Sequence, residues 1–294
     1  MMIYYILLIV SLAGAVTKNL LPKAGGKRFS TLDGLMTVNI MSGIAGMIIV
    51  AFGGVDIKNI SGAFVVIMAL LYGLFTLAMQ SFYMTAAECG SVSVCSLIYA
   101  SCFVIQTIFS AVYSGEACSA LNICGIAVML ASLAMVSLKD LGGKKGNKIS
   151  VILAVISMLF AAGVGIVQKI FAAMYGKHGQ NEYVFLAFMF MAFFGVLVKF
   201  TICRRNKKEN KDAYSAVGRF YMFACAMALC VAVVNKLNVI LITVLPGVLY
   251  FPVYAAGTVL CSAICSRIIL KEKLTKLQWV GIVCGVAAIV MIVM

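Results

Sequence analysis

Lys236 is a cationic residue in a long apolar run, and two amide side chains lie beside it. The run reads CVAVVNKLNVILITVL, and no other charged residue occurs between Phe220 and Cys265. Asn235 and Asn238 are three residues apart and therefore share one face of a helix. An ammonium group with two amides can bind a carboxylate or a phosphate. The pattern predicts a site for a small anionic or zwitterionic solute. The open alternatives are an ammonium that extends to a membrane interface, or a loop.

Two further lysines, Lys18 and Lys169, come late in other apolar runs. Ionisable groups inside a membrane are costly and are commonly functional. The sequence therefore predicts that both contribute to the same solute site. The alternative is that each extends its ammonium group to the nearby interface, which is inexpensive at a helix end.

The stretch LPGVLYFPVY carries a second set of candidates. Pro246 and Pro252 remove backbone donors and can open a helix toward a cavity, or they can mark a helix start and a tolerated kink. Tyr250 and Tyr254 are four residues apart and are expected to line the cavity or to pack. Glu88, between two apolar runs, is the acid nearest the apolar interior. We assign it, with the two prolines, to gating or coupling.

Catalytic and metal-binding patterns are missing from the sequence. The single histidine, His178, lies in the polar stretch GKHGQNE, and no HExxH, GxSxG or phosphate-binding motif occurs. The 11 cysteines form no CxxC pair, and most lie in apolar runs where they serve as small packing residues. We therefore expect no enzyme activity, no cofactor and no metal site.

The amino-acid composition indicates whether the chain is surrounded by water or by lipid. The chain has 294 residues, of which 64% are hydrophobic and 11% are charged. Soluble domains carry roughly 45–50% apolar and about 25% charged residues. A net charge of +14 would suggest nucleic acid in a soluble protein. Here the basic residues lie in short connections between apolar segments, which indicates an integral membrane protein with the bilayer, and no nucleic acid, as its partner.

Ten apolar segments are long enough to cross a bilayer as helices. They cover residues 3–21, 33–52, 61–84, 91–113, 119–138, 149–173, 183–202, 216–242, 247–270 and 275–294. The predicted fold class is therefore an all-α integral membrane protein with ten transmembrane helices, multi-pass in the cytoplasmic membrane.

The two halves of the chain resemble each other. GEACSALNICGIAVMLASLAMV at 115–136 matches KEKLTKLQWVGIVCGVAAIVMI at 271–292 with a constant offset of 156 residues, and each copy begins with a capping-box pattern. The same offset places Lys236 opposite Gln80, another polar residue in an apolar run. At the front of each half, GAVTKNL matches GIVQKIF, so Lys18 pairs with Lys169. Five helices per half force opposite orientations. We predict two inverted repeats, residues 1–138 and 149–294.

Lysine and arginine residues are distributed unevenly between the connections on the two sides of the membrane. With Lys18, Lys169 and Lys236 set aside, only Lys58 and Lys177 follow even-numbered segments, and every other lysine and arginine lies in, or at the edge of, a connection that follows an odd-numbered one. Short basic connections stay in the cytoplasm. The charges therefore indicate that both termini face outside.

These features resemble the EamA-type drug/metabolite transporters over nearly the whole chain. In that family each half has a lysine late in its first helix, a glutamate after its fourth and a glycine-rich fifth helix. Lys18, Glu116 and Gly125 match this pattern in the first half, and Lys169, Glu272 and Gly281 match it in the second. Both glutamates precede a helix start, where an acid is favoured by the helix dipole. The resemblance implies termini in the cytoplasm, in conflict with the charges.

The sequence thus favours a secondary transporter of a small metabolite, such as an amino acid, an organic acid or a phosphorylated compound, that works by alternating access. The alternatives are a multidrug or cation exporter and a membrane protein that does not transport. A homo-oligomer is compatible with the sequence and is not indicated by it. Substrate identity, direction of transport and coupling ion are not encoded in any pattern above.

Overall fold

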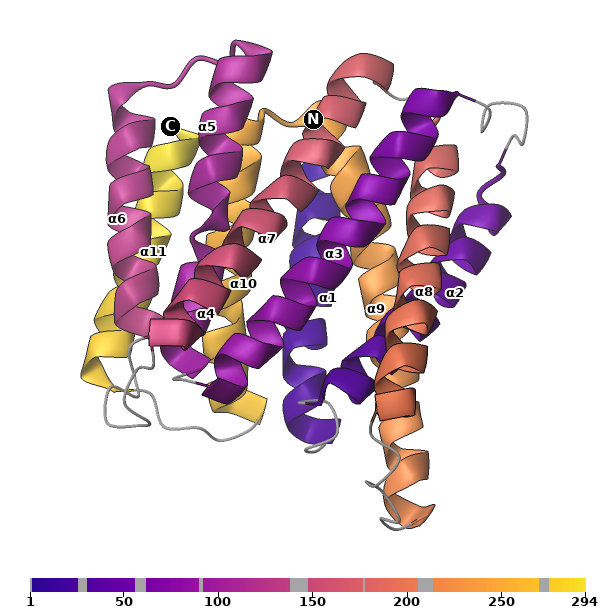
Figure 1. Ribbon diagram of the computed structural model, residues 1–294. Coiled ribbons are helices and arrows are strands. Elements are labelled where there is room, and N and C mark those ends of the chain that lie inside the picture. The colour runs from indigo at the N-terminus through magenta and orange to yellow at the C-terminus, as the bar shows by residue number, and fades with distance from the viewer. Residues whose placement is uncertain are drawn as a thin grey trace.

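A computed structural model describes residues 2–25, 31–55, 62–89, 92–137, 148–176, 178–205, 214–269 and 275–294. These residues form eleven helices that run up and down the molecule, with both termini at the same end (Figure 1). The helices are α1 (Met2–Gly25), α2 (Leu32–Phe52), α3 (Ala63–Cys89), α4 (Val92–Ala100), α5 (Cys102–Ser114), α6 (Ala120–Ser137), α7 (Lys148–Tyr175), α8 (Gln180–Arg205), α9 (Tyr214–Val244), α10 (Gly247–Ile269) and α11 (Lys276–Val293).

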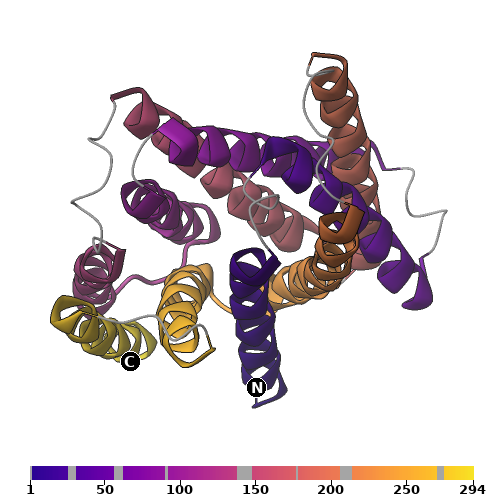
Figure 2. The same cartoon turned by 90° about the horizontal axis from the view of Figure 1, so that it is seen from below.

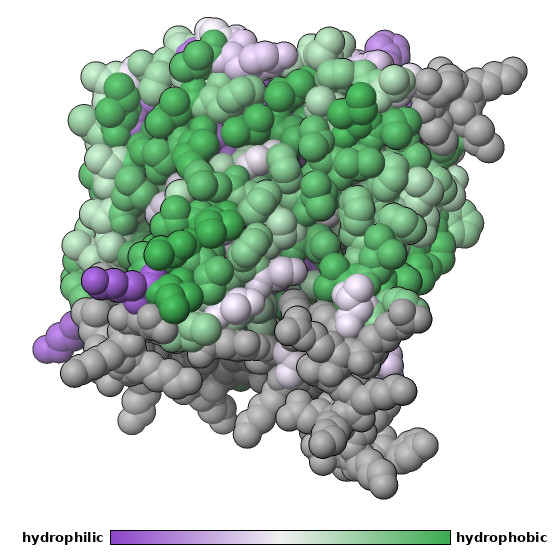
Figure 3. All heavy atoms as spheres, in the orientation of Figure 1, coloured by the Kyte–Doolittle hydropathy of each residue, from purple (hydrophilic) through white to green (hydrophobic). Residues whose placement is uncertain are grey.

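The described residues contain nine helical stretches that are long and apolar enough to span a bilayer, together with a shorter apolar helix, Ala120–Val136. Large hydrophobic side chains such as Ile6, Phe193 and Val283 point outward. The face in Figure 3 is apolar over most of its height, and hydrophilic side chains gather toward its rims. This surface suits a hydrocarbon solvent, in which every backbone polar group has to be paired within a helix.

The fourth predicted segment is not one continuous helix, because α4 and α5 meet at a turn at Ser101. The Ser101 hydroxyl donates to the Leu97 carbonyl at 2.9 Å, and its backbone N–H is shared between the Leu97 and Ile98 carbonyls. Such back-bonding by a serine tightens the turn and bends a helix. Hydropathy alone merges the two pieces, since both are apolar and together span Val94–Ser114.

Helices from the two halves of the chain pack on one another in pairs. The closest pairs are α3 with α7, α6 with α11, α2 with α8 and α1 with α9, and α5 packs on α10. In the view along the helices, α1, α10, α11, α5 and α6 lie on one side, and α2, α3, α8 and α9 lie on the other (Figure 2). The main helix contacts join the first half of the chain to the second, so the core lies between the two halves.

The α6–α11 pair is antiparallel, and glycines set its separation. A Cβ placed on Gly125 would lie 2.7 Å from the side chain of Ile292 and 3.2 Å from Met291 Cβ. A Cβ placed on Gly281 would lie 2.8 Å from Met135 Cβ. Each glycine therefore lets the partner's backbone approach closely, as small residues do in membrane helix pairs. The contacts at Gly125 recur at Gly281 with every residue number shifted by 156 residues.

Hydrogen bonds tie the same two helices at both ends. Asn122 donates to the Ile292 carbonyl at 2.8 Å, and Gln278 donates to the Val136 carbonyl at 3.0 Å. Both donors sit at the start of their helices, and both acceptors at the end of the partner helix. This exchange is again related by the 156-residue offset.

The predicted capping boxes are confirmed at the starts of these helices. Thr275 and Gln278 exchange side-chain and backbone hydrogen bonds before α11. Ser119 and Asn122 form the same reciprocal pair before α6, at 2.9 and 3.1 Å. Two otherwise unpaired backbone donors are thereby satisfied at each helix start.

Candidate functional site

The side-chain amides of Asn235 and Asn238 in α9 belong to two different polar clusters between the helices. The Asn238 side chain accepts a hydrogen bond from the Ser11 hydroxyl of α1 at 2.7 Å. The Tyr254 hydroxyl of α10 lies close to both side chains. Three helices from both halves thus meet at one polar point in an apolar interior. A buried polar group costs free energy unless it is paired, and this pairing fixes the three side chains.

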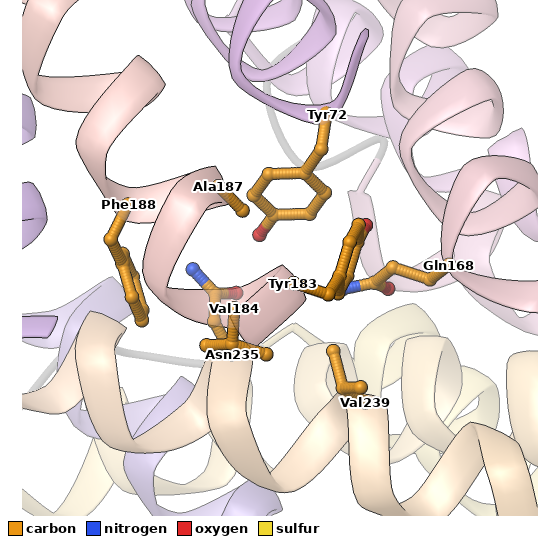
Figure 4. Close-up of a pocket in the computed structure, with 8 residues that line it drawn as sticks. All are labelled: Tyr72, Gln168, Tyr183, Val184, Ala187, Phe188, Asn235 and Val239. Carbon is orange, nitrogen blue, oxygen red and sulfur yellow. The ribbon is translucent and has the colours of Figure 1, made fainter. Parts of the chain in front are cut away.

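Asn235, less than one turn earlier, faces a different cluster. It lines a small void together with Tyr72 of α3, Gln168 of α7 and Tyr183 of α8. In Figure 4 the Tyr72 hydroxyl and the Asn235 amide point into the same space. Apolar side chains of α8 and α9, from Val184, Ala187, Phe188 and Val239, complete the lining. The void has a volume of about 10 Å³, which is roughly the room for one water molecule.

Tyrosines surround both clusters. Tyr250 stacks on Tyr254 with ring centroids 5.5 Å apart. Tyr72 meets Tyr183 edge to face at 6.2 Å. Tyr250 also lies near Tyr72. The two clusters are therefore parts of one central region lined by phenol rings.

The buried hydroxyls of Tyr183 and Tyr250 in this region lack a hydrogen-bond partner within the described part of the protein, and so does Oε1 of Gln80, elsewhere in α3. Buried polar groups are nearly always paired, so each such atom needs an explanation. A bound solute or water would supply the partners. The predicted cavity residues Asn235, Asn238, Gln80, Tyr250 and Tyr254 all have buried or half-buried side chains.

Lys236, the strongest sequence candidate, extends toward the end of α2. A Cβ placed on Gly53 would lie 2.8 Å from the Lys236 Nζ atom and 3.2 Å from the Val50 carbonyl oxygen. Asn181 donates to the Gly53 and Gly54 carbonyls at 3.2 and 2.9 Å at the same helix end. Carbonyls and the helix dipole favour a cation there. Lys236 is half-buried, and its role in solute binding stays a prediction.

The paired lysines of the two halves have different surroundings. Lys18 of α1 is half-buried and near the Cys230 thiol of α9. Lys169 of α7 is buried and forms an ion pair with Glu116, in which Nζ and Oε1 are 2.7 Å apart. The sequence places Glu116 before a helix start, and the structure adds that its carboxylate serves another helix. Its Oε2 atom accepts from the Val248 N–H of α10 at 2.8 Å.

The remaining candidates lie at helix ends and in α10. Pro246 immediately precedes α10, and its carbonyl accepts from the backbone of Leu249 and Tyr250. Pro252 lies inside that helix and is buried. Glu88 is the penultimate residue of α3, and its side chain lies outside what the structure describes, as does all of Glu272.

Four residues of the central region were not predicted from the sequence. Gln168 is an amide in an apolar helix, so the criterion that selected Asn235 would have found it. Ser11, Tyr72 and Tyr183 carry no such signal, because serine and tyrosine are ordinary in membrane helices. No group of three or more acidic, histidine or cysteine side chains gathers into a metal site among the described residues.

Comparison with known proteins identifies the family. The model of the EamA-like transporter family matches residues 148–294, which is half of the chain. The chain belongs to the EamA-like transporter family. It is thus a multi-pass membrane protein, and membership of this family indicates a transporter of small molecules and not an enzyme.

A solved structure described as "Crystal structure of protein" has the same fold. It superposes with a TM-score of 0.78 and 14% sequence identity over 98% of this chain and 95% of the other. At that identity the similarity establishes the fold alone. No curated protein sequence matches the chain.

Proposed function

We propose that this EamA-like protein is a secondary transporter that carries a small zwitterionic metabolite, such as an amino acid, across the cytoplasmic membrane by alternating access. In this proposal the chain crosses the bilayer ten times, with α4 and α5 forming one span. Residues 1–138 and 149–294 are two inverted repeats, and the solute binds between them.

The helix pairs support the inverted repeat. Exchanging the halves maps α1 onto α7, α2 onto α8, α3 onto α9 and α6 onto α11. Under this exchange the α1–α9 pair becomes the α7–α3 pair, and the α2–α8 and α6–α11 pairs map onto themselves. Each resulting pair is one that packs together in the structure. Because α6 and α11 are antiparallel, a two-fold axis relating them lies across the helices. An axis in the membrane plane is the arrangement that inverted-repeat transporters use.

The central polar region supports a solute site at the interface of the repeats. The observation that carries the proposal is the Ser11–Asn238–Tyr254 cluster, together with the unpaired hydroxyl of Tyr250, which stacks on Tyr254, and that of Tyr183 in the Asn235 cluster. Hydroxyl and amide groups can both donate and accept, so they suit a solute with an ammonium and a carboxylate. Lys18, two turns along α1 from Ser11, would supply a cation for the carboxylate, and Lys236 of α9 extends toward the end of α2.

Ligand binding is tested first with the purified protein. A panel of amino acids, organic acids, phosphorylated metabolites and lipophilic cations is screened by thermal unfolding, because a ligand at 100 times its Kd stabilises by about 2.7 kcal/mol. Uptake of the best ligand is then measured in proteoliposomes. We expect Asn238→Leu to lower uptake roughly tenfold or more, since a hydrogen bond to a charged group contributes about 1.5–3 kcal/mol.

Asn19→Leu is the matched control, because Asn19 of α1 is an exposed amide whose hydrogen bond, to the Ser262 hydroxyl at 3.3 Å, lies at the surface and outside the proposed site. Its uptake should equal that of the parent protein. Normal uptake by a folded Asn238→Leu variant would refute the proposed site.

The tyrosine-rich lining favours one second candidate, export of an organic cation. Tyrosine faces attract cations within about 6 Å of the ring centre. Stabilisation by lipophilic cations and none by amino acids in the same screen would favour this candidate over the first.

A further inference from the structure

A buried ion pair joins three elements at the end of the molecule where the termini lie. Glu116 belongs to the connection between α5 and α6, and Lys169 belongs to α7. Their side chains are 15% and 9% exposed. The second carboxylate oxygen binds the Val248 N–H, at the first turn of α10. In Figure 1 the α5–α6 connection and the ends of α7 and α10 share the end that carries both termini.

Each group in this contact compensates an unpaired hydrogen-bond donor or a charge of another group. Proline has no N–H, so the first donors of α10 after Pro246 are those of Gly247 and Val248, which have no partner within the helix. A carboxylate at that position is favoured by the helix dipole and by direct hydrogen bonds. Lys169 neutralises the carboxylate, and the pair compensates two charges that burial would otherwise penalise.

The contact crosses between the proposed repeats. Glu116 comes from the first, whereas Lys169 and Val248 come from the second. Directly beside it, the buried Ser110 of α5 packs against Gly247 of α10, so the helices approach closely there. Its members are one side-chain pair and the backbone N–H groups at the start of α10.

The opposite end has a weaker ion pair among the described residues. Lys199 of α8 lies 3.8 Å from Asp33 of α2, with side chains 29% and 33% exposed. It also donates to the Thr37 hydroxyl at 2.7 Å. Solvent-exposed ion pairs contribute about 0–1 kcal/mol, so this contact holds its helices together less firmly than a buried one.

We propose that Glu116, Lys169 and the α10 N-terminus form a latch that holds the cavity shut at the end carrying the termini. The described conformation is then the one closed at that end. This inference rests on the proposed alternating-access function. Breaking the latch shifts the population toward conformations open at the same end, because a contact present in only one of two states biases the equilibrium by its own free energy.

The test measures access to Ser110, behind the latch. Ser110→Cys removes no hydrogen bond, since the Ser110 hydroxyl has none in the structure. The variant is reconstituted without solute and treated with a membrane-impermeant maleimide, and labelled peptides are quantified by mass spectrometry. Cys118 is a native exposed thiol two residues from Glu116 and serves as the internal reference for that end.

Glu116→Gln or Lys169→Met, added to Ser110→Cys, should raise labelling at residue 110 at least threefold relative to Cys118. Lys199→Met, the matched control at the opposite end, should leave this ratio unchanged. If Lys169→Met does not accumulate in the membrane, Glu116→Gln carries the test alone, because glutamine keeps the volume and an oxygen acceptor for Val248.

An unchanged ratio in a folded Glu116→Gln variant overturns the latch, and so does an equal rise in Lys199→Met. The labelling assay requires no transport. A raised ratio in a protein that transports none of the solutes therefore leaves the latch standing and removes the proposed function. Normal transport with an unchanged ratio does the reverse.

Discussion

Replacing Gly281 with alanine should force α6 and α11 apart. The new Cβ would lie 2.8 Å from Met135 Cβ and 3.1 Å from the Ser132 carbonyl oxygen. Carbon atoms attract best at about 3.5–4.0 Å, so the first contact is roughly 0.7 Å too close. Both obstructing atoms belong to or adjoin the backbone, and a rotamer change cannot move them away. The helices themselves have to shift.

The shift weakens a set of short hydrogen bonds. Ser132 donates to the Gly281 carbonyl at 2.7 Å, and Gln278 donates to the Val136 carbonyl at 3.0 Å. Lengthening each by about 0.7 Å takes them to or beyond the range of good geometry. Overpacking of this kind costs about 1–3 kcal/mol, whereas glycine to alanine in a helix gains about 0.5–1 kcal/mol. The net expectation for Gly281→Ala is a destabilisation of up to about 2.5 kcal/mol.

Two further variants calibrate the measurement. Gly125→Ala meets the equivalent residues across the same helix pair, but its nearest obstacle is the Ile292 side chain and Met291 Cβ is 3.2 Å away, so it should cost less than Gly281→Ala. Gly218 in α9 has nothing within 4 Å of an added Cβ, so Gly218→Ala should be neutral or slightly stabilising. Stability is measured by chemical unfolding in detergent. Equal stabilities for Gly281→Ala and Gly218→Ala would refute the packing argument.

Three other outcomes are expected. A C-terminal reporter active only outside the cytoplasm should be functional if the charges set the orientation, because the basic ends of α7, α8, α10 and α11 all lie opposite the termini; cytoplasmic activity alone would contradict it. Lys236→Met should abolish most uptake of an anionic or zwitterionic solute while Lys236→Arg keeps part of it, and lost stability with normal uptake would assign Lys236 only to the end of α2. Burial raises the pKa of Glu116, but hydrogen bonds from Lys169, Val248 and Gly247 and the Lys169 charge lower it more, to a value below the usual 4.5. The ion pair should therefore stabilise the protein above about pH 4.5 and lose its contribution as the pH falls through the lowered pKa. The stability difference between parent and Glu116→Gln should be constant from pH 5 to 8 and should shrink in acid, and a change between pH 6 and 7 would contradict this.

Much of the architecture was predictable from local pattern. Apolar length identifies a spanning helix because backbone groups in hydrocarbon have no other partner. The capping pairs at Ser119 and Thr275 were visible for a similar reason, since a cap involves residues only three positions apart. The bend at Ser101 was missed, because hydropathy does not record whether a serine bonds to its own helix.

The central site was predictable only in part. Asn235 and Asn238 stand out because an amide in an apolar run is rare and therefore informative. Tyr72 and Tyr183 could not be distinguished from the other tyrosines, since nothing local separates a ring that lines a cavity from one that faces lipid. Their shared position depends on how α3 and α8 cross, and that is set by contacts between residues far apart in the chain.

Hydrophobic length alone identifies the chain as a membrane-spanning helical protein, because it is a property of consecutive residues. What the charges do depends on the tertiary structure. Lys169 and Lys236 both read as ammonium groups in apolar helices, yet one pairs with Glu116 from the other half and the other reaches the end of α2. The identity of a buried charge's partner is fixed by the packing of distant helices, because a charge in a low-dielectric interior interacts with whichever group lies nearest in space.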